Sequence, residues 1–187
     1  MTTGVDTSTE PTAEPAVSTS DPVLPTPGVY LYDTVGDERV DAIGGSVHDH
    51  PATTTITLSI DGDCVATRWD ALDQRWDQAQ YCRTASGWER TAMTAFHSFF
   101  HQDGTVVGIE SVQVDGRSVD SLHVHDEVAI SGNSTGQQVI DRWYSRDAPL
   151  LLTKGVRTGS ATLETAIGAV HYDERFELAL TSLQPIS

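Results

Sequence analysis

The sequence predicts a mainly β fold in which an antiparallel meander forms a curved sheet or half-barrel. Apolar and polar residues alternate with a period of two along most of the chain from Gly28 onward, as they do in strands with one buried and one solvated face. Turn signals rich in Gly, Asp and Ser separate these runs at short intervals, and β-branched residues are frequent within the runs.

The predicted strands follow one another as successive hairpins. They occupy residues 28–35, 52–60, 64–69, 75–82, 105–114, 121–130, 137–145, 150–158 and 169–183. Asp115-Gly116 is the strongest hairpin signal, because both residues tolerate the positive φ angles of a two-residue turn. In the last run the apolar side chains Val170, Tyr172, Phe176, Leu178 and Leu180 share one face. Such alternation favours a half-buried sheet.

One passage has helical spacing instead. In "ERTAMTAFHSFFHQ" the apolar residues Met93, Phe96, Phe99 and Phe100 recur at intervals of three and four, which places them on one side of a helix. We therefore expect one short helix around residues 88–101.

The first 27 residues differ from the rest of the chain. They are rich in Thr, Ser, Pro, Glu and Ala and contain no aromatic residue, so they cannot bury enough apolar surface to offset the entropy of ordering them. We expect residues 1–27 to be a disordered acidic linker and residues 28–187 to be a single β-rich domain. Such a tether makes sense if an export or anchor segment precedes Met1, and membrane attachment is expected only through that segment.

The charge of the chain excludes some partners. It has 27 acidic and 11 basic residues and a net charge of −16. An acidic protein without a basic stripe is repelled by phosphate backbones, so nucleic acid is not expected as a partner.

Cys64 and Cys82 are the two cysteines, and they bracket a nearly symmetric segment centred on Asp73. If this segment is a hairpin, the two thiols face one another across adjacent strands at the separation of a disulfide. Two reduced cysteines are the alternative. A disulfide implies an oxidising compartment, which favours an extracytoplasmic, secreted or membrane-tethered protein.

Four stretches carry a resemblance: "DGDCVATRWDALDQRWDQAQYC", "FHSFF", "STGQQVIDRWYS" and "IGAVHYDERFELALTSLQP". They resemble a poorly characterised group of actinobacterial envelope proteins, over roughly residues 28–185. The resemblance implies a membrane segment, a Pro/Thr-rich linker and a β-rich extracytoplasmic domain. At the level of pattern, residues 141–158 also resemble the curved-sheet lipoprotein carriers and lipid-binding lipoproteins, which hold acyl chains in a half-barrel. This chain departs from them in its short passage between Phe100 and Gly104.

The histidines offer a metal-binding alternative. His97 and His101 are spaced to share a helix face. His123, His125 and Glu127 alternate along one side of a strand. Together these residues could ligate zinc or another transition metal. No HExxH motif is present, and histidines at alternate positions are common on polar strand faces, so we expect a solvated face and no cofactor.

Three Arg-Trp pairs suggest a ligand-binding face. The indoles of Trp69, Trp76 and Trp143, with the rings of Phe96 and Phe100, could line a concave sheet. The alternative is that the indoles are core anchors. No motif of nucleophilic or phosphate chemistry is present, so no catalytic residue is assigned. We expect a non-enzymatic envelope domain that binds a lipid, another apolar or amphipathic ligand, or an envelope protein. A metal-dependent enzyme and a purely structural interaction module are the alternatives.

Overall fold

The computed structural model describes residues 24–41, 45–71, 75–85, 87–94, 98–166 and 168–186. It gives the backbone alone for 70–71, 75–78, 92–94 and 98–103. The described residues form eleven strands: β1 Gly28–Asp41, β2 Ser46–Asp49, β3 Thr53–Asp61, β4 Cys64–Ala71, β5 Arg75–Thr84, β6 Gly87–Thr94, β7 Ser98–Val114, β8 Arg117–Gly132, β9 Ser134–Ser145, β10 Leu152–Thr165 and β11 Gly168–Leu180. In this part of the chain no helix is long and apolar enough to cross a membrane.

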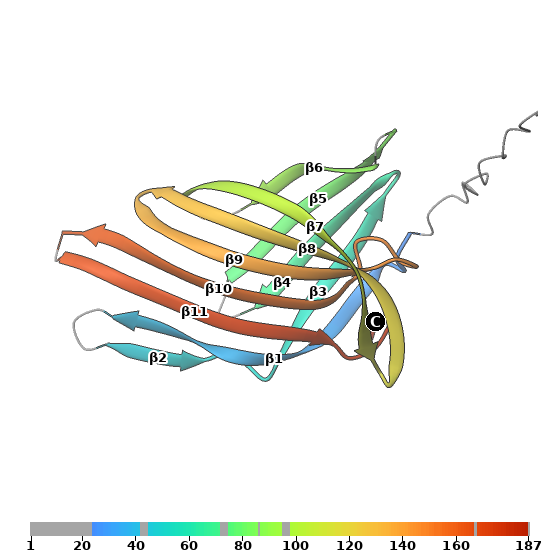
Figure 1. Cartoon of the computed structure of the whole chain (residues 1–187), viewed down its shortest axis with the longest axis horizontal. Coiled ribbons are helices and arrows are strands. Elements are labelled where there is room, and N and C mark those ends of the chain that lie inside the picture. Colours follow the sequence, from blue (N-terminus) through green and yellow to red (C-terminus); the bar gives the residue numbers. More distant parts are fainter. Residues whose placement is uncertain are drawn as a thin grey trace, which may run out of the picture.

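All the strands belong to one antiparallel sheet. Its order is β6-β5-β4-β3-β1-β11-β10-β9-β8-β7, and β2 pairs separately with β1. Most neighbouring strands are consecutive in the chain and form hairpins. The pairing of β1 with β11 joins the first strand of the chain to the last. The predicted antiparallel meander is therefore confirmed (Figure 1).

The sheet has two chemically different faces. The inner face is the side on which Tyr32, Phe176 and Leu178 lie, and the outer face is the side on which His123 and His125 lie. The register continues this alternation from strand to strand, because Tyr32 opposes Leu180 and Thr34 opposes Leu178. The buried core cluster comprises Tyr30, Tyr32, Ile56, Leu58, Val65, Val114, Val119, Leu151, Phe176, Leu178 and Leu180.

The sheet rolls over its inner face. β4 and β11 are separated in the sheet by β3 and β1. Even so, the ring centroids of Trp69 on β4 and Phe176 on β11 lie only 5.2 Å apart. Figure 1 shows β3, β4 and β5 crossing behind the long strands β9–β11. The architecture is a half-barrel, as the sequence predicted.

Gly36 permits the close approach of β1 to β11. It opposes Phe176 in the register, and its φ angle is +150°. A Cβ atom at this position would lie 2.1 Å from the carbonyl oxygen of Arg175. Glycine is therefore required here, where the two strands bend together.

The packed part of the chain begins before β1. Pro25 is fully buried, Leu24 packs against the core cluster, and the Tyr30 hydroxyl donates to the Thr26 carbonyl oxygen over 2.7 Å. Leu24 and Pro25, which the sequence assigned to the linker, thus contribute to the core. Residues 1–23 lie outside the described residues, so the predicted disorder of the linker stays a prediction.

The predicted helix around residues 88–101 is not confirmed, because the described residues of this passage form β6 and the start of β7. β6 also contains a β-bulge. Gln80 opposes Ala92 while Tyr81 opposes Arg90, so Thr91 is an extra residue in β6. The extra residue breaks the period of two within β6. The apparent helical spacing also spans two strands, because Met93 lies in β6 while Phe99 and Phe100 lie in β7. Residues 95–97 lie outside the described residues.

The predicted disulfide is confirmed. Cys64 and Cys82 are directly opposed on β4 and β5, with their Cα atoms 4.0 Å apart and their sulfurs bonded. The symmetry of the intervening segment predicted this pairing within one residue of register. Trp69 opposes Asp77 and Trp76 opposes Asp70, so the two indole-bearing residues are neighbours and not direct partners.

Candidate functional site

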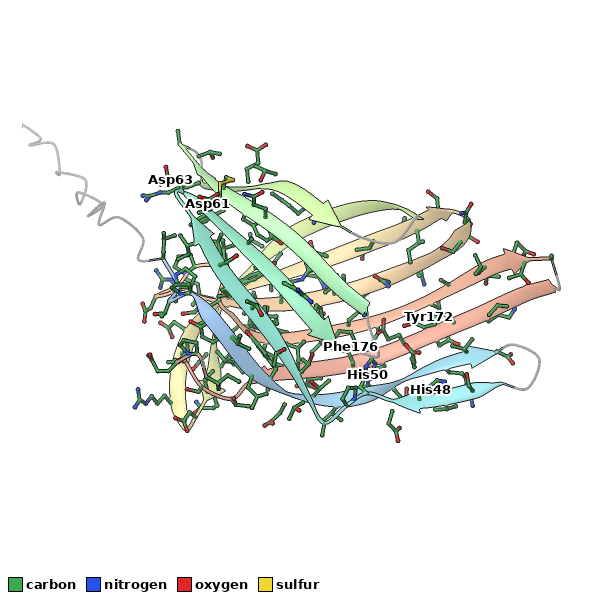
Figure 2. All side chains as sticks on the ribbon, turned by 180° about the vertical axis from the view of Figure 1, so that it is seen from behind. His48, His50, Asp61, Asp63, Tyr172 and Phe176 are labelled. Atoms are coloured by element: carbon green, nitrogen blue, oxygen red, sulfur yellow. A yellow bond between two sulfur atoms is a disulfide. The ribbon has the colours of Figure 1, made fainter. Side chains whose placement is uncertain are left out.

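A cluster of aromatic and ionisable side chains lies on the inner face where the sheet rolls over. We call His50, Trp69, Arg157, Glu174 and Phe176 the inner cluster. The Arg157 guanidinium lies 4.5 Å from the centroid of Phe176 and 5.6 Å from that of Trp69. The His50 ring lies 5.1 Å from Phe176, and Figure 2 shows these two residues side by side. Four separate parts of the chain therefore meet at one place.

Local structure positions each member of the inner cluster. Arg157 on β10 directly opposes Phe176 on β11, so their side chains emerge on the same face. His50 follows β2, and its backbone N–H donates to the Gly36 carbonyl oxygen over 2.9 Å. Because Gly36 itself opposes Phe176, this hydrogen bond holds His50 close to the Phe176 ring.

Arg157 and Glu174 form a buried ion pair. Arg157 Nη2 donates to Glu174 Oε1 over 2.7 Å, and the Glu174 side chain is only 1% exposed. His50 Nε2 lies 3.8 Å from the same carboxylate oxygen, which is too far for a hydrogen bond. Burial lowers the pKa of His50 and outweighs the opposing effect of Glu174. The ring is therefore uncharged at neutral pH.

Several buried polar atoms here lack a partner. Trp69 Nε1, Arg157 Nε, His50 Nε2 and Thr34 Oγ1 have no hydrogen-bond partner within the described part of the chain. Three of the four belong to the inner cluster, and Thr34 lies two residues from Gly36 on the same strand. A buried donor without a partner costs free energy comparable to a lost hydrogen bond. Within the described residues, nothing compensates these groups for their lost hydration.

A second ion pair lies further along the inner face. Asp126 on β8 is 2% exposed, and Arg142 on β9 donates to its carboxylate. Gly104 on β7 opposes Asp126, and a Cβ atom there would lie 2.6 Å from Asp126 Oδ1. The charge of Asp126 is thus compensated by its neighbour, and the close backbone of β7 leaves little room beside it.

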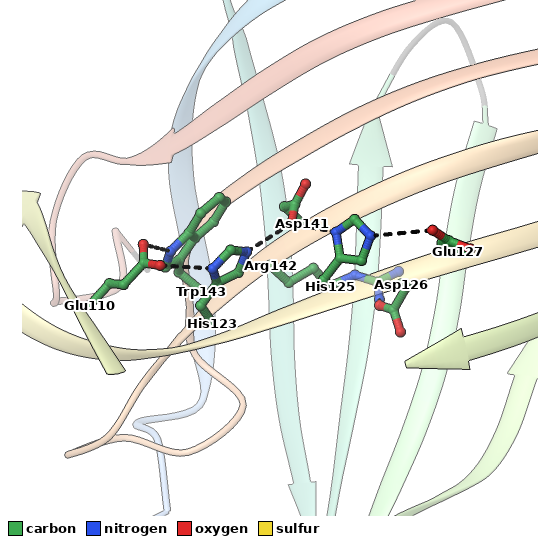
Figure 3. Close-up of polar contacts among 8 residues, drawn as sticks. All are labelled: Glu110, His123, His125, Asp126, Glu127, Asp141, Arg142 and Trp143. Atoms are coloured by element: carbon green, nitrogen blue, oxygen red, sulfur yellow. Dashed lines mark hydrogen bonds and ion pairs between the residues drawn. The ribbon is translucent and has the colours of Figure 1, made fainter. Parts of the chain in front are cut away.

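The outer face carries a hydrogen-bonded chain of carboxylates and imidazoles, which we call the outer network (Figure 3). Its members are Glu110, His123, His125, Asp141 and Trp143. Asp141 Oδ1 accepts from His123 Nε2 over 2.8 Å and from His125 Nδ1 over 2.9 Å. Glu110 accepts from His123 Nδ1 over 2.9 Å and from Trp143 Nε1 over 2.8 Å. The His123 ring stacks on Trp143 with centroids 4.2 Å apart.

The outer network shifts the pKa values of its members. The hydrogen bond to Asp141 raises the pKa of His125. Burial acts to raise the pKa of Asp141, but the hydrogen bonds from His125 and His123 outweigh it and lower that pKa. The hydrogen bonds from Trp143 and His123 lower the pKa of Glu110. The carboxylates therefore stay ionised to lower pH, and His125 stays charged to higher pH, than in an unfolded chain.

We predict that His125 titrates above pH 6.5 and that Asp141→Asn moves its midpoint down. A raised pKa means that the protonated ring stabilises the fold below pH 6.5 and that this contribution is lost as the pH rises through the folded value. The midpoint is measured from the imidazole NMR signals. Glu127→Gln is the matched control, because Glu127 lies 3.9 Å from His125 Nε2 and a smaller shift is expected. An unchanged midpoint in the Asp141 variant would refute the assignment.

A hollow of about 600 Å³ also opens on the outer face, across β1, β2 and β9–β11. Its charged lining residues are Asp37, Arg39, Asp173, Glu174 and Arg175, and Val47 and Val139 add apolar surface. The three acidic residues outnumber the two arginines, and no aromatic ring from the described residues lines the hollow. The hollow therefore offers a ligand fewer specific contacts than the inner cluster does.

The structure separates the aromatic residues that the sequence proposed as one binding face. Trp69 lies on the inner face, packed against Phe176, whereas Trp143 lies on the outer face in the outer network. They cannot line the same concave surface. For Trp76 and Phe100 only the backbone is described, in β5 and β7, and Phe96 lies outside the described residues.

The metal alternative stays a prediction. His123, His125 and Glu127 lie on the outer face as expected, where His123 and His125 are engaged with carboxylates. Across the described residues no group of three or more His, Cys, Asp or Glu side chains could hold a metal ion. His97 lies outside the described residues, and for His101 only the backbone is described, opposite Ala129 on β8.

Sequence reasoning missed His50, Arg157 and Glu174. A signal was present for Glu174, because it occupies an inward position between Tyr172 and Phe176 in an otherwise apolar series. An acidic residue on an apolar face requires a partner. For His50 and Arg157 the sequence contained no comparable signal, since their contacts depend on long-range pairing.

Comparison with known proteins adds little. No protein-family model and no curated protein matches the chain. The crystal structure of a DUF1329 family protein from Desulfovibrio piger aligns with 15% identity over 81% of this chain and 84% of that chain, with a TM-score of 0.20. At such a TM-score the likeness supports no argument about function.

Proposed function

We propose that this protein is a non-enzymatic extracytoplasmic domain that binds an apolar or amphipathic ligand at the inner face of its half-barrel. The observation that carries the proposal is the inner cluster, where buried donors that have no partner among the described residues adjoin two aromatic rings. Ligand sites in proteins commonly combine apolar walls with a few fixed polar groups.

The chemistry of the inner cluster favours recognition over catalysis. The Glu174 carboxylate already accepts from Arg157, so it is a poor general base. Burial disfavours the charged form of His50, and its Nε2 atom is not hydrogen-bonded to Glu174. A catalytic acid–base pair needs its two groups within hydrogen-bond reach of the reacting proton. The inner cluster instead presents fixed hydrogen-bond donors beside the aromatic rings of Trp69 and Phe176.

The disulfide supports the proposed location. Cys64 and Cys82 are bonded, and disulfides persist mainly in oxidising compartments such as the cell exterior. The resemblance to actinobacterial envelope proteins points to the same location. Because that location is rich in acylated molecules, an acyl chain is the first ligand class to test.

The proposal is tested by tryptophan quenching with a brominated twelve-carbon acyl ester, since bromine quenches only nearby indoles. We expect saturable quenching that Trp69→Phe removes in large part, because Trp69 lies in the inner cluster. Trp143→Phe is the matched control and should retain the quenching, because Trp143 lies on the outer face. Absence of saturable quenching in the unmodified protein would refute the proposal. Quenching lost in the Trp143 variant alone would move the site to the outer face.

A further inference from the structure

We infer, on the basis of the proposed function, that the inner cluster recognises an uncharged carbonyl oxygen, the ester or amide oxygen of an acyl group. This oxygen accepts hydrogen bonds from Trp69 Nε1 and Arg157 Nε. The ligand class is therefore a neutral acyl ester or amide, as opposed to a free fatty acid or a hydrocarbon.

Two of the four unpartnered atoms, Trp69 Nε1 and Arg157 Nε, require an acceptor, whereas His50 Nε2 and Thr34 Oγ1 can donate or accept. Both the indole N–H of Trp69 and the Nε–H of Arg157 can only donate. Both atoms are inaccessible and lack a hydrogen-bond partner in the described ranges. A carbonyl oxygen has two lone pairs and can accept from both donors at once. A hydrocarbon can accept from neither.

One edge of the Arg157 guanidinium makes only one of its two possible hydrogen bonds within the described residues. Its Nη2 atom donates to Glu174, while its Nε atom, on the same edge of the planar group, has no partner among the described residues. A carboxylate that received both bonds would saturate this edge, but Glu174 receives only one. The remaining donor lies next to the one that Glu174 uses, so a second acceptor would bind beside the Glu174 carboxylate.

Charge determines that this acceptor should be neutral. The charge of Arg157 is already compensated by Glu174, and burial keeps His50 uncharged. An added carboxylate would leave one excess negative charge beside the buried Glu174. Burying an uncompensated charge is far more costly than burying a hydrogen-bonded carbonyl. The net charge of −16 adds to the repulsion of anions.

The surroundings suit the acyl chain that carries such a carbonyl. The rings of Trp69 and Phe176 lie against one another at an interplanar angle of 63°, and both adjoin the guanidinium. The Arg157 side chain is 19% exposed while that of Glu174 is 1% exposed, so a ligand approaches from the Arg157 side, where a shift of the Arg157 side chain uncovers the two donors. An acyl group that arrives there meets aromatic surface and the two donors together.

The inference is tested by measuring the affinities of methyl laurate, laurate and dodecane by titration calorimetry in dilute detergent-free buffer. Methyl laurate should bind at least about 10-fold more tightly than either of the others, because two hydrogen bonds of ordinary strength are gained. Trp69→Phe keeps an aromatic ring but removes the N–H, and should cut the preference for the ester over dodecane about 5-fold. Trp143→Phe should leave the preference unchanged.

The outcomes separate this inference from the proposed function. Equal binding of methyl laurate and dodecane, or a preference for laurate, would overturn the inference and leave acyl-chain binding in place. No binding of any of the three would overturn both. Arg157→Lys provides a second variant if Trp69→Phe does not fold: it keeps the charge beside Glu174 but lacks the Nε–H, and an unchanged ester preference in it would also overturn the inference.

Discussion

Replacing Cys64 and Cys82 together by Ala should lower the free energy of unfolding by about 2–5 kcal/mol. The two residues are 18 positions apart in the chain, and closing a loop of this length contributes about 3 kcal/mol in the chain-entropy model. The bond also ties β4 to β5 on the side of the sheet that rolls over the inner face. Loss of the bond should therefore also loosen the packing of Trp69 on Phe176.

The measurement is urea denaturation of the oxidised protein, the reduced protein and the Cys64→Ala, Cys82→Ala variant. The reduced protein and the variant should unfold at similar, lower urea concentrations, and a reductant should have no effect on the variant. Thiol labelling of the unfolded, unreduced protein gives an independent check. Two reactive thiols per chain would contradict the disulfide and remove one support for an extracytoplasmic location.

Much of the sheet follows from local patterns in the sequence. In residues 121–130 the alternation predicts that the histidines and the apolar residues lie on opposite faces, and Val128 and Ile130 are indeed buried. The Asp115-Gly116 turn joins β7 to β8, with φ angles of 50° and 70°. These features are predictable because strand alternation and two-residue turns depend only on neighbouring residues.

The features that the sequence did not predict depend on pairings between distant residues. The single extra residue Thr91 changes the apparent period of β6, and it is recognised only against the partner strand. Trp69 and Trp143 have similar sequence surroundings, but the register places them on opposite faces. The inner cluster draws His50, Arg157 and Glu174 from distant segments, and no local pattern links these residues. The sequence therefore did not predict the inner cluster, because its residues come close together only when the sheet curves.

Replacing Glu174 by Ala should lower the free energy of unfolding by about 3 kcal/mol. Removing one partner of a buried ion pair leaves the other charge without compensation, which typically costs about 3–5 kcal/mol. The partial exposure of Arg157, at 19%, places the effect at the lower end of this range. The loss should be read from urea denaturation at pH 7.

Two further variants distinguish burial from charge alone. Glu177→Ala is the matched control on the same strand: Glu177 pairs with Lys154 over 2.9 Å and its side chain is 52% exposed, so its loss should cost less than about 1 kcal/mol. The double variant Arg157→Met, Glu174→Met should regain most of the stability lost by Glu174→Ala, since apolar side chains of similar volume can replace a buried ion pair. If the Glu174 and Glu177 variants lost equal stability, Glu174 would not be the buried partner on which the architecture of the inner cluster depends. If the double variant were as unstable as Glu174→Ala, the cost would come from lost packing and not from the uncompensated charge of Arg157.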